Sequence, residues 1–186
     1  HDEPIYARSG HSISIDHPAA ASYPGQVAFI LAANLAARWC RRIRLVGPDV
    51  PVDLRLFAFL PLAPRNLVGF SIAIAEAADP FGDFKAGEPG DGYGDWLQLH
   101  VGGGTAAAGA YRIQGHEWLA TAGDAVHKGE PAQSSNPLGA ALAACVGVAW
   151  AFRAALGETT LPRSVRLSLW NVRGGEHAVA GPRTTG

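Results

Sequence analysis

The sequence predicts an α/β fold, with a Rossmann-like, mainly parallel sheet and helices on both faces. Two observations carry this prediction. Short alternating segments recur between helical segments, and the first three elements form a strand–helix–strand unit. The chain has 186 residues, of which 48% are hydrophobic and 17% charged, which suits one globular core. We expect residues 1–173 to form a single domain and residues 174–186 a flexible tail or linker.

The first half of the chain supplies the strand–helix–strand unit and a second helix. Residues 12–16 alternate polar and β-branched side chains, as strands do. Residues 26–41 place apolar side chains on one helical face and end in arginines, which suit the helix dipole. Residues 44–48 form a strand stopped by Gly-Pro, reached by a right-handed crossover. Residues 53–62 form a helical turn or a short strand, and residues 66–78 a second helix.

The second half completes the sheet. Residues 81–95 are rich in Gly, Asp and Pro and are expected to form an exposed loop. Residues 96–101 alternate like a strand, and residues 111–120 are expected to form a hairpin. Residues 138–156 form a helix that is apolar nearly all round, which predicts burial. Residues 164–172 form a final alternating strand.

Composition restricts the partners and the compartment. The net charge is −1 and no basic tract is present, so we expect no nucleic acid. No run reaches about 18 uninterrupted apolar residues and no signal peptide is visible, so we expect no membrane and a cytoplasmic location. Cys40 and Cys145 lie in apolar helical patterns and are expected to be buried free thiols. The chain contains no methionine, which indicates a processed chain or, preferably, a piece of a longer one.

Two glycine-containing connections are candidates for anion binding. The connection at residues 16–25 holds one glycine and two prolines, so the backbone amides that bind phosphate in Rossmann folds are not expected there. Gly102, Gly103 and Gly104 follow a strand and could bind an anion through their amides, or form a flexible turn.

Catalytic and metal-binding motifs give little signal. The seven histidines show no His-Glu-x-x-His spacing and no cysteine pair is close enough to chelate, so we expect no metal site. No Gly-x-Ser-x-Gly motif is present, and no catalytic residue is assigned. His100 stands apart because it lies at a strand end, where α/β sheets bind ligands. One hypothesis is therefore an α/β enzyme that binds a small molecule or nucleotide near His100 and Gly102–Gly104.

Two stretches of the chain carry a family resemblance. The first runs from Val27 to Cys40 and on through Ile43 to Val50, and the second from Ser135 to Arg153, followed by Leu167–Asn171. Together they resemble a degenerate copy of the ThiF-type adenylyltransferase domain, found in ubiquitin-activating enzymes and their bacterial relatives. The chain departs from that family in lacking its Gly-rich ATP loop and its catalytic cysteine segment. Of the family's Val-Asp-x-Asp motif, only Asp49 is present.

This resemblance implies an inactive adenylation half that is not catalytic alone. It would pack against an active ThiF-type half in a bacterial ubiquitin-like activation system, or form a homo-oligomer, and could also hold a ubiquitin-like protein. No cofactor is expected, and ATP only together with the partner half. Tyr6-Ala7-Arg8 resembles the segment through which one half lends an arginine to the nucleotide, which makes Arg8 a candidate. A binding module without ligand chemistry is a third hypothesis.

Overall fold

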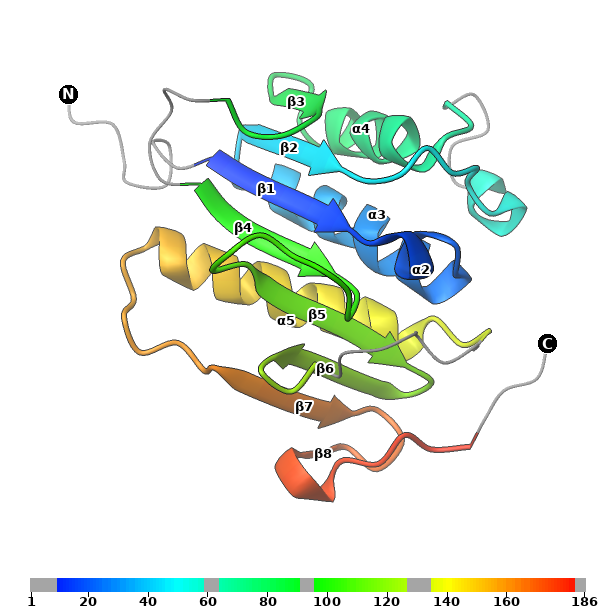
Figure 1. Cartoon of the computed structure of the whole chain (residues 1–186), viewed down its shortest axis with the longest axis vertical. Coiled ribbons are helices and arrows are strands. Elements are labelled where there is room, and N and C mark those ends of the chain that lie inside the picture. Colours follow the sequence, from blue (N-terminus) through cyan, green and yellow to red (C-terminus); the bar gives the residue numbers. More distant parts are fainter. Residues whose placement is uncertain (1–9, 59–63, 91–95, 127–134, 183–186) are drawn as a thin grey trace.

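The computed structural model describes residues 10–58, 64–90, 96–126 and 135–182. Within these ranges the chain forms one eight-stranded sheet with helices packed on it (Figure 1). The strands are β1 (Gly10–Ile15), β2 (Arg42–Val46), β3 (Asp83–Ala86), β4 (Trp96–Val101), β5 (Tyr111–His116), β6 (Leu119–Gly123), β7 (Ser164–Ser168) and β8 (Arg173–Gly174). The helices are α2 (His17–Ala20), α3 (Tyr23–Ala37), α4 (Leu67–Ala78) and α5 (Leu138–Ala155), with 3-10 turns η1 (Leu54–Ala58) and η2 (Gly175–His177).

The strand order is β3-β2-β1-β4-β5-β6-β7-β8. Strands β3, β2, β1, β4 and β5 are parallel neighbours, whereas β6, β7 and β8 continue the sheet in antiparallel fashion. The mainly parallel α/β sheet predicted from the sequence is therefore confirmed, as is the hairpin, which is formed by β5 and β6. Strand β3 was not predicted, because it lies inside the segment at residues 81–95 that was expected to be a loop. It adds to the outer edge of β2.

The three long helices lie on one face of the sheet, with α3 between α4 and α5 (Figure 1). The expectation of helices on both faces was wrong in this respect. Strand β5 lies on the opposite side of β1 from β2, so a right-handed crossover from β4 to β5 runs over the other face. That crossover consists of residues 102–110, which form a loop and not a helix. The second face is therefore left to polar side chains and loops.

Strand alternation separates the two faces chemically. Ile13, Ile43, Leu45 and Leu99 point to the helix layer and are completely buried, and they form the core together with the helix side chains. The residues between them are largely polar, as in Ser12 and Ser14 of β1. The helix-facing side thus provides the hydrophobic stabilisation, and the other side is free to carry a polar site.

Helix α5 is less buried than its sequence suggested. Among the described residues it is long and apolar enough to cross a membrane, yet 44% of it is buried inside the domain, where it packs on β4, β5 and β6. Its outer side is exposed, including Cys145, so the expectation of a buried thiol was wrong there. Cys40 is buried, as expected, and Cys40 and Cys145 are not joined by a disulfide.

The segment after β8 packs on the domain. Ser168 donates a hydrogen bond to the carbonyl oxygen of Val179 (2.6 Å), and Ala178 is buried. The carbonyl oxygen of Ala180 accepts a hydrogen bond from the Trp118 amide. Residues 178–180, which lie within the segment expected to be a flexible tail or linker, thus contact the domain.

Candidate functional site

The carboxyl ends of β1 and β4 form the point at which the sheet changes direction. From β1 the chain turns to α2 and α3 on the helix side, whereas from β4 it turns to the loop on the other face. Such a switch point leaves a crevice in which open α/β sheets bind ligands. His100 lies here, as expected from its place at a strand end, and it faces Ser14 across the β1–β4 pairing.

Three polar side chains meet in this crevice. The Oγ atom of Ser14 lies 2.9 Å from Nδ1 of His100, and Nε2 of His100 lies 3.6 Å from Oδ2 of Asp16. His100 is only 2% exposed, so its ring is held by the protein and not by solvent. The arrangement places an imidazole between a hydroxyl group and a carboxylate. It could bind a polar ligand or move a proton.

Asp16 joins the connection after β1 to the loop after β4. Its carboxylate accepts hydrogen bonds from the amides of Ala19 (2.8 Å) and Gly104 (2.7 Å). Burial, the largest single influence, opposes its ionisation, but His100 and the two amides together lower the pKa of Asp16. Asp16 is therefore a carboxylate at neutral pH, and it occupies one of the glycine-loop amides that were considered for an external anion.

Glycine is required in the loop by this close approach. Gly102 has a φ of +119°, and a Cβ atom there would lie 2.1 Å from Oδ2 of Asp16. The amide of Gly102 donates to the carbonyl oxygen of Ile113. Gly103 is buried between Gly102 and Gly104. The three glycines thus allow this loop to approach Asp16 closely and to hydrogen-bond β5.

A cavity of about 190 Å³ opens beside these residues on the polar face of the sheet. Its polar lining comes from Ser12, Ser14, Asp16, Glu88, Gln98, His100 and Thr105. No lysine or arginine is among the described residues that line it. Hydroxyl, amide and carboxylate groups favour a small neutral or cationic ligand, whereas a polyphosphate would meet the charge of Asp16.

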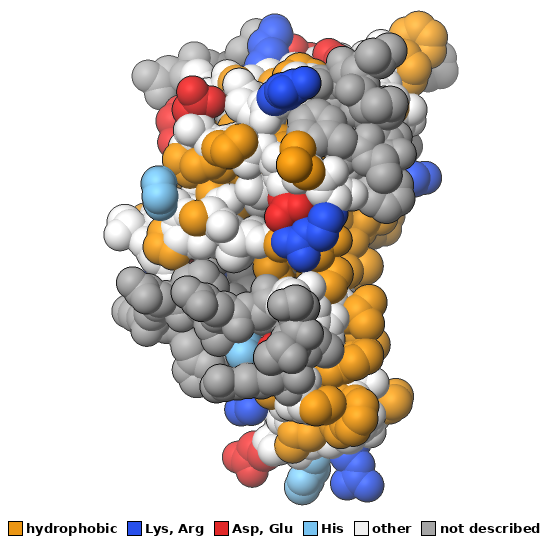
Figure 2. Space-filling view, turned by 90° about the vertical axis from the view of Figure 1, so that its right-hand side faces the viewer, with side chains coloured by type: hydrophobic (Ala, Val, Ile, Leu, Met, Phe, Trp, Pro, Cys, Tyr) orange, Lys and Arg blue, Asp and Glu red, His pale blue; other side chains and the backbone are white. Residues whose placement is uncertain are grey.

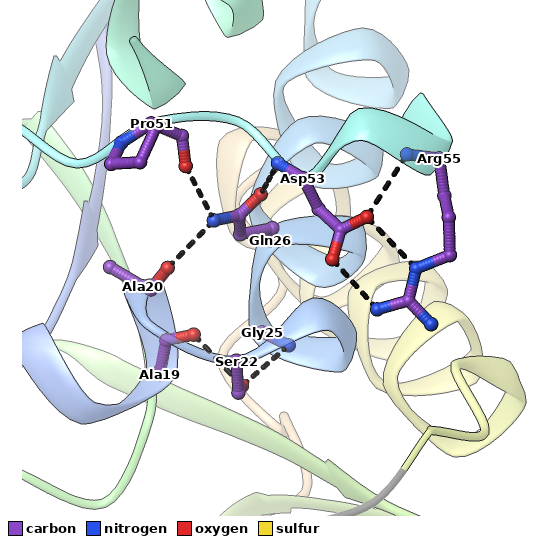
Figure 3. A network of polar contacts seen from close by, with 8 residues as sticks. All are labelled: Ala19, Ala20, Ser22, Gly25, Gln26, Pro51, Asp53 and Arg55. Atoms are coloured by element: carbon purple, nitrogen blue, oxygen red, sulfur yellow. Dashed lines mark hydrogen bonds and ion pairs between the residues drawn. The ribbon is translucent and has the colours of Figure 1, made fainter. Parts of the chain in front are cut away.

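A second polar network lies beside this crevice, at the carboxyl ends of β1 and β2 (Figure 3). Gln26 is buried, and its amide nitrogen donates to the carbonyl oxygens of Ala20 (2.9 Å) and Pro51 (3.0 Å). Its side-chain oxygen accepts the amide of Asp53 (2.8 Å). The connections that follow β1 and β2 are thereby tied together. Arg55, which lies over the ring of Tyr23, forms an ion pair with Asp53 that lowers the pKa of this carboxyl group.

Helix α2 lies across the start of α3, where Rossmann folds bind phosphate. A Cβ atom on Gly25 would lie 2.1 Å from the carbonyl oxygen of Ala19, so the two helices are in direct backbone contact. Ser22 caps α3 by accepting the amide of Gly25 (3.1 Å) and donating to the carbonyl of Ala19 (2.9 Å). The backbone of Ala19 and the side chain of Ser22 therefore lie directly against the start of α3.

The structure unites most of the residues selected from sequence. His100, Gly102, Gly103 and Gly104 lie together, whereas Arg8 is outside the described residues. Sequence reasoning missed the contributions of Ser14, Asp16 and Gln26. A polar Ser-x-Asp pattern at the carboxyl end of β1 was the available signal for the first two. Among described residues, no three His, Cys, Asp or Glu side chains gather to hold a metal ion.

Comparison with known proteins adds a family and a fold. The family model of the BilD N-terminal domain matches residues 10–169. A search of curated proteins gave no match. Similar solved structures include E. coli MccB with succinimide, with a TM-score of 0.58 and 9% identity over 88% of this chain. PaaA has a TM-score of 0.57 and 13% identity, over 91% of this chain and 73% of its own.

These matches show that the chain has a ThiF-like fold, which it shares with MccB and PaaA. E. coli MccB has also been solved with ATP, at a TM-score of 0.56 and 9% identity over 88% of this chain. The chain spans 62% of the length of both MccB structures. At such identities the likeness concerns the fold alone.

Proposed function

Because the chain belongs to the BilD N-terminal domain family, we propose that it is a pseudo-adenylation module that packs against an active ThiF-type half. In this proposal the assembly acts in a bacterial, cytoplasmic system that activates a ubiquitin-like protein, and ATP binds only where the active half contributes its phosphate loop. MccB, which shares the fold, has been solved with ATP and also with AMPCPP and MccA together.

One observation carries the proposal: α2 packs against the start of α3, which is where Rossmann folds bind phosphate. Gly25 contacts the backbone of Ala19 there. Gln26 holds the connection after β2 close to the start of α3 through hydrogen bonds to Pro51 and Asp53. A triphosphate would have to displace both contacts. The nearby glycine loop supports the same conclusion, because Gly104 already donates to the carboxylate of Asp16.

A cluster of exposed apolar side chains at the β7–β8 end of the sheet supports the proposed association with a partner. We call it the hairpin patch, after the antiparallel pair of β7 and β8 beside which it lies. It comprises Leu169, Trp170, Val172 and Val179, which are 42%, 54%, 87% and 46% exposed. Figure 2 shows hydrophobic side chains gathered at this lower end of the molecule. Val172 also has a φ of +52°, an uncommon conformation for a β-branched residue. Exposed apolar side chains on a strained turn are typical of a protein contact.

The first test is nucleotide binding by calorimetry. The chain alone should bind neither ATP nor ADP, since α2 packs against the start of α3 and no Gly-rich loop precedes it. Saturable ATP binding by the isolated chain would contradict the proposal.

The second test is association with a ThiF-type half that carries an intact Gly-rich loop, encoded in the same polypeptide or beside it. Co-expressed wild-type chain should co-purify with that half, and Trp170→Glu and Val172→Glu should weaken the association at least tenfold. Phe81→Glu is the matched control, because Phe81 is 83% exposed but lies beside β3, at the other edge of the sheet. Equal loss in the control, or no association of the wild type, would count against the proposal.

A small-molecule site in the crevice is the second candidate function, and the buried imidazole of His100 beside a cavity of about 190 Å³ favours it. Calorimetric titration with adenine and adenosine, which are uncharged at neutral pH, tests this alternative. A Thr105→Trp variant, which narrows the exposed side of the cavity, should abolish any binding that occurs there. Absence of binding to the wild-type chain would exclude these two compounds as ligands of the crevice.

A further inference from the structure

A cavity of about 520 Å³ lies at the end of the sheet opposite the crevice, where β5 and β7 begin and β6 ends (Figure 1). Its volume falls within the range of about 300–1,000 Å³ that small-molecule sites occupy. Among the residues that line it are Tyr111, Arg112, Asp124, Trp150, Leu161 and Arg163. We call this cavity the β5–β7 pocket.

One wall of the β5–β7 pocket is apolar. The ring of Tyr111 stacks on that of Trp150 from α5, with ring centroids 4.3 Å apart and ring planes 5° from parallel. Leu161 and Pro162, from the connection between α5 and β7, also line the cavity. Burial raises the pKa of Tyr111, and the carboxylate of Asp124 raises it further, so the phenol is neutral at physiological pH. This wall therefore carries no charge and suits the flat hydrocarbon part of a ligand.

Hydrogen bonds hold the walls of the pocket in place. The hydroxyl group of Tyr111 donates to the carbonyl oxygen of Pro162 (3.3 Å). The amide of Asp124 donates to the carbonyl oxygen of Arg163 (2.8 Å). A Cβ atom on Gly123 would overlap the same carbonyl oxygen, so the end of β6 and the segment before β7 are in direct backbone contact. A ligand therefore meets a cavity that is formed before binding, which reduces the entropy cost of binding.

Two arginines give the pocket a positive charge. Arg112 and Arg163 line it, and Asp124 is the one acidic residue of its described lining, which leaves a net charge of +1. Neither arginine forms an ion pair within the part of the chain that the structure describes. A guanidinium group binds a planar carboxylate through two parallel N–H groups. The net charge suits a ligand with one negative charge, whereas the carboxylate of Asp124 would repel a phosphate dianion more strongly.

We propose that the β5–β7 pocket binds a small monocarboxylic acid that carries a flat apolar group. The apolar group lies against the wall formed by Trp150 and Leu161, and the carboxylate binds the two arginines. This site is independent of the proposed pseudo-adenylation role, because α2 and the crevice lie at the other end of the sheet and the hairpin patch contributes no residue to the pocket. Failure of one proposal therefore leaves the other unaffected.

Calorimetry and NMR titration of the full chain with 2-naphthylacetate test the proposal. The chain should bind this acid with a dissociation constant below about 1 mM, and the backbone amide signals of Tyr111, Gly123 and Asp124 should shift. The compound 2-naphthylacetamide has nearly the same shape but no charge, and it should bind at least about tenfold more weakly. The inference would be overturned by absence of binding at millimolar acid, by amide shifts confined to other parts of the chain, or by equal affinity for the uncharged compound.

Substitutions with opposite expected effects test the charges of the pocket. Arg163→Gln, at an exposed position, should weaken binding of 2-naphthylacetate at least about fivefold, and Arg112→Gln should do the same. Asp124→Asn removes the opposing carboxylate and should strengthen binding about two- to threefold. Arg173→Gln is the matched control, because Arg173 is exposed on β8 outside the pocket, and it should bind like the wild type.

Urea unfolding checks that each variant is folded before its affinity is compared with that of the wild type. Arg163 and Asp124 are exposed, so their substitution should leave the unfolding midpoint unchanged. Unaltered affinity in both Arg163→Gln and Asp124→Asn, or an equal loss in Arg173→Gln, would overturn the inference.

Discussion

Acidification should destabilise this domain through His11, which lies completely buried on β1 with its ring edge-on to Trp39. Burial lowers the pKa of His11 from 6.5 to about 4, although backbone groups at Ser12 and Leu97 favour the charged form. The folded chain keeps His11 neutral, whereas the unfolded chain binds a proton below about pH 6.5. Stability from this residue is therefore complete above pH 6.5 and is lost as the pH falls toward 4.

The magnitude follows from the width of that interval. Each pH unit between the two pKa values is worth about 1.4 kcal/mol, so lowering the pH from 7.5 to 5.0 should reduce the free energy of unfolding by about 2 kcal/mol. Urea unfolding followed by tryptophan fluorescence at the two pH values measures this loss. Asp16, Asp53 and Asp83, whose pKa values are lowered, contribute mainly below this window.

A His11→Phe variant isolates the effect. It cannot bind a proton, so its free energy of unfolding should change by about 2 kcal/mol less than that of the wild type between pH 7.5 and 5.0. His17→Asn, at an exposed histidine, is the matched control and should retain the wild-type difference. An equal pH dependence in His11→Phe and wild type would refute the reasoning, whatever the absolute stability of the variant.

Three further substitutions test the site and the hairpin patch by urea unfolding at pH 7.5. Gly102→Ala should cost at least about 2 kcal/mol, since the new Cβ meets Asp16 at a positive φ; an unchanged midpoint would show that the loop can move away. Gln26→Leu should cost about 3 kcal/mol, because it leaves two carbonyls and one amide without their partner; a loss below about 1 kcal/mol would mean that water replaces them. Val172→Asn should raise the free energy of unfolding by about 1 kcal/mol, because asparagine tolerates the left-handed conformation and an 87% exposed valine contributes little packing. A decrease would indicate that Val172 makes intramolecular contacts of its own.

Local pattern was sufficient for most elements because their signals lie within a few residues. The strand at residues 12–16 and the helix at residues 66–78 match β1 and α4 closely, and Asn66 caps α4 by accepting the amide of Gly69. Helix α3 begins earlier than expected because Ser22 caps it and proline is favoured in its first turn. Strand β3 was missed because four residues at a sheet edge, rich in charge, differ little from a loop.

The candidate site was only half visible in the sequence. The position of His100 and the three glycines at a strand end could be read from the sequence. Their arrangement as a site depends on Asp16, which lies 84 positions or more away from them in the chain. The register of β1 on β4 brings them together, and register is a property of the sheet. Gln26 was invisible for the same reason, since its partners belong to the connections after two different strands.

The sequence by itself determined the α/β class, the boundaries of most elements and the lack of a Gly-rich phosphate loop, because periodicity, capping and turn residues are local. Only the tertiary structure decided which face each element covers. It placed all three long helices on one side, put α2 over the start of α3, and left one side of α5 exposed. These outcomes depend on strand order and crossover handedness, which act between segments far apart in the chain.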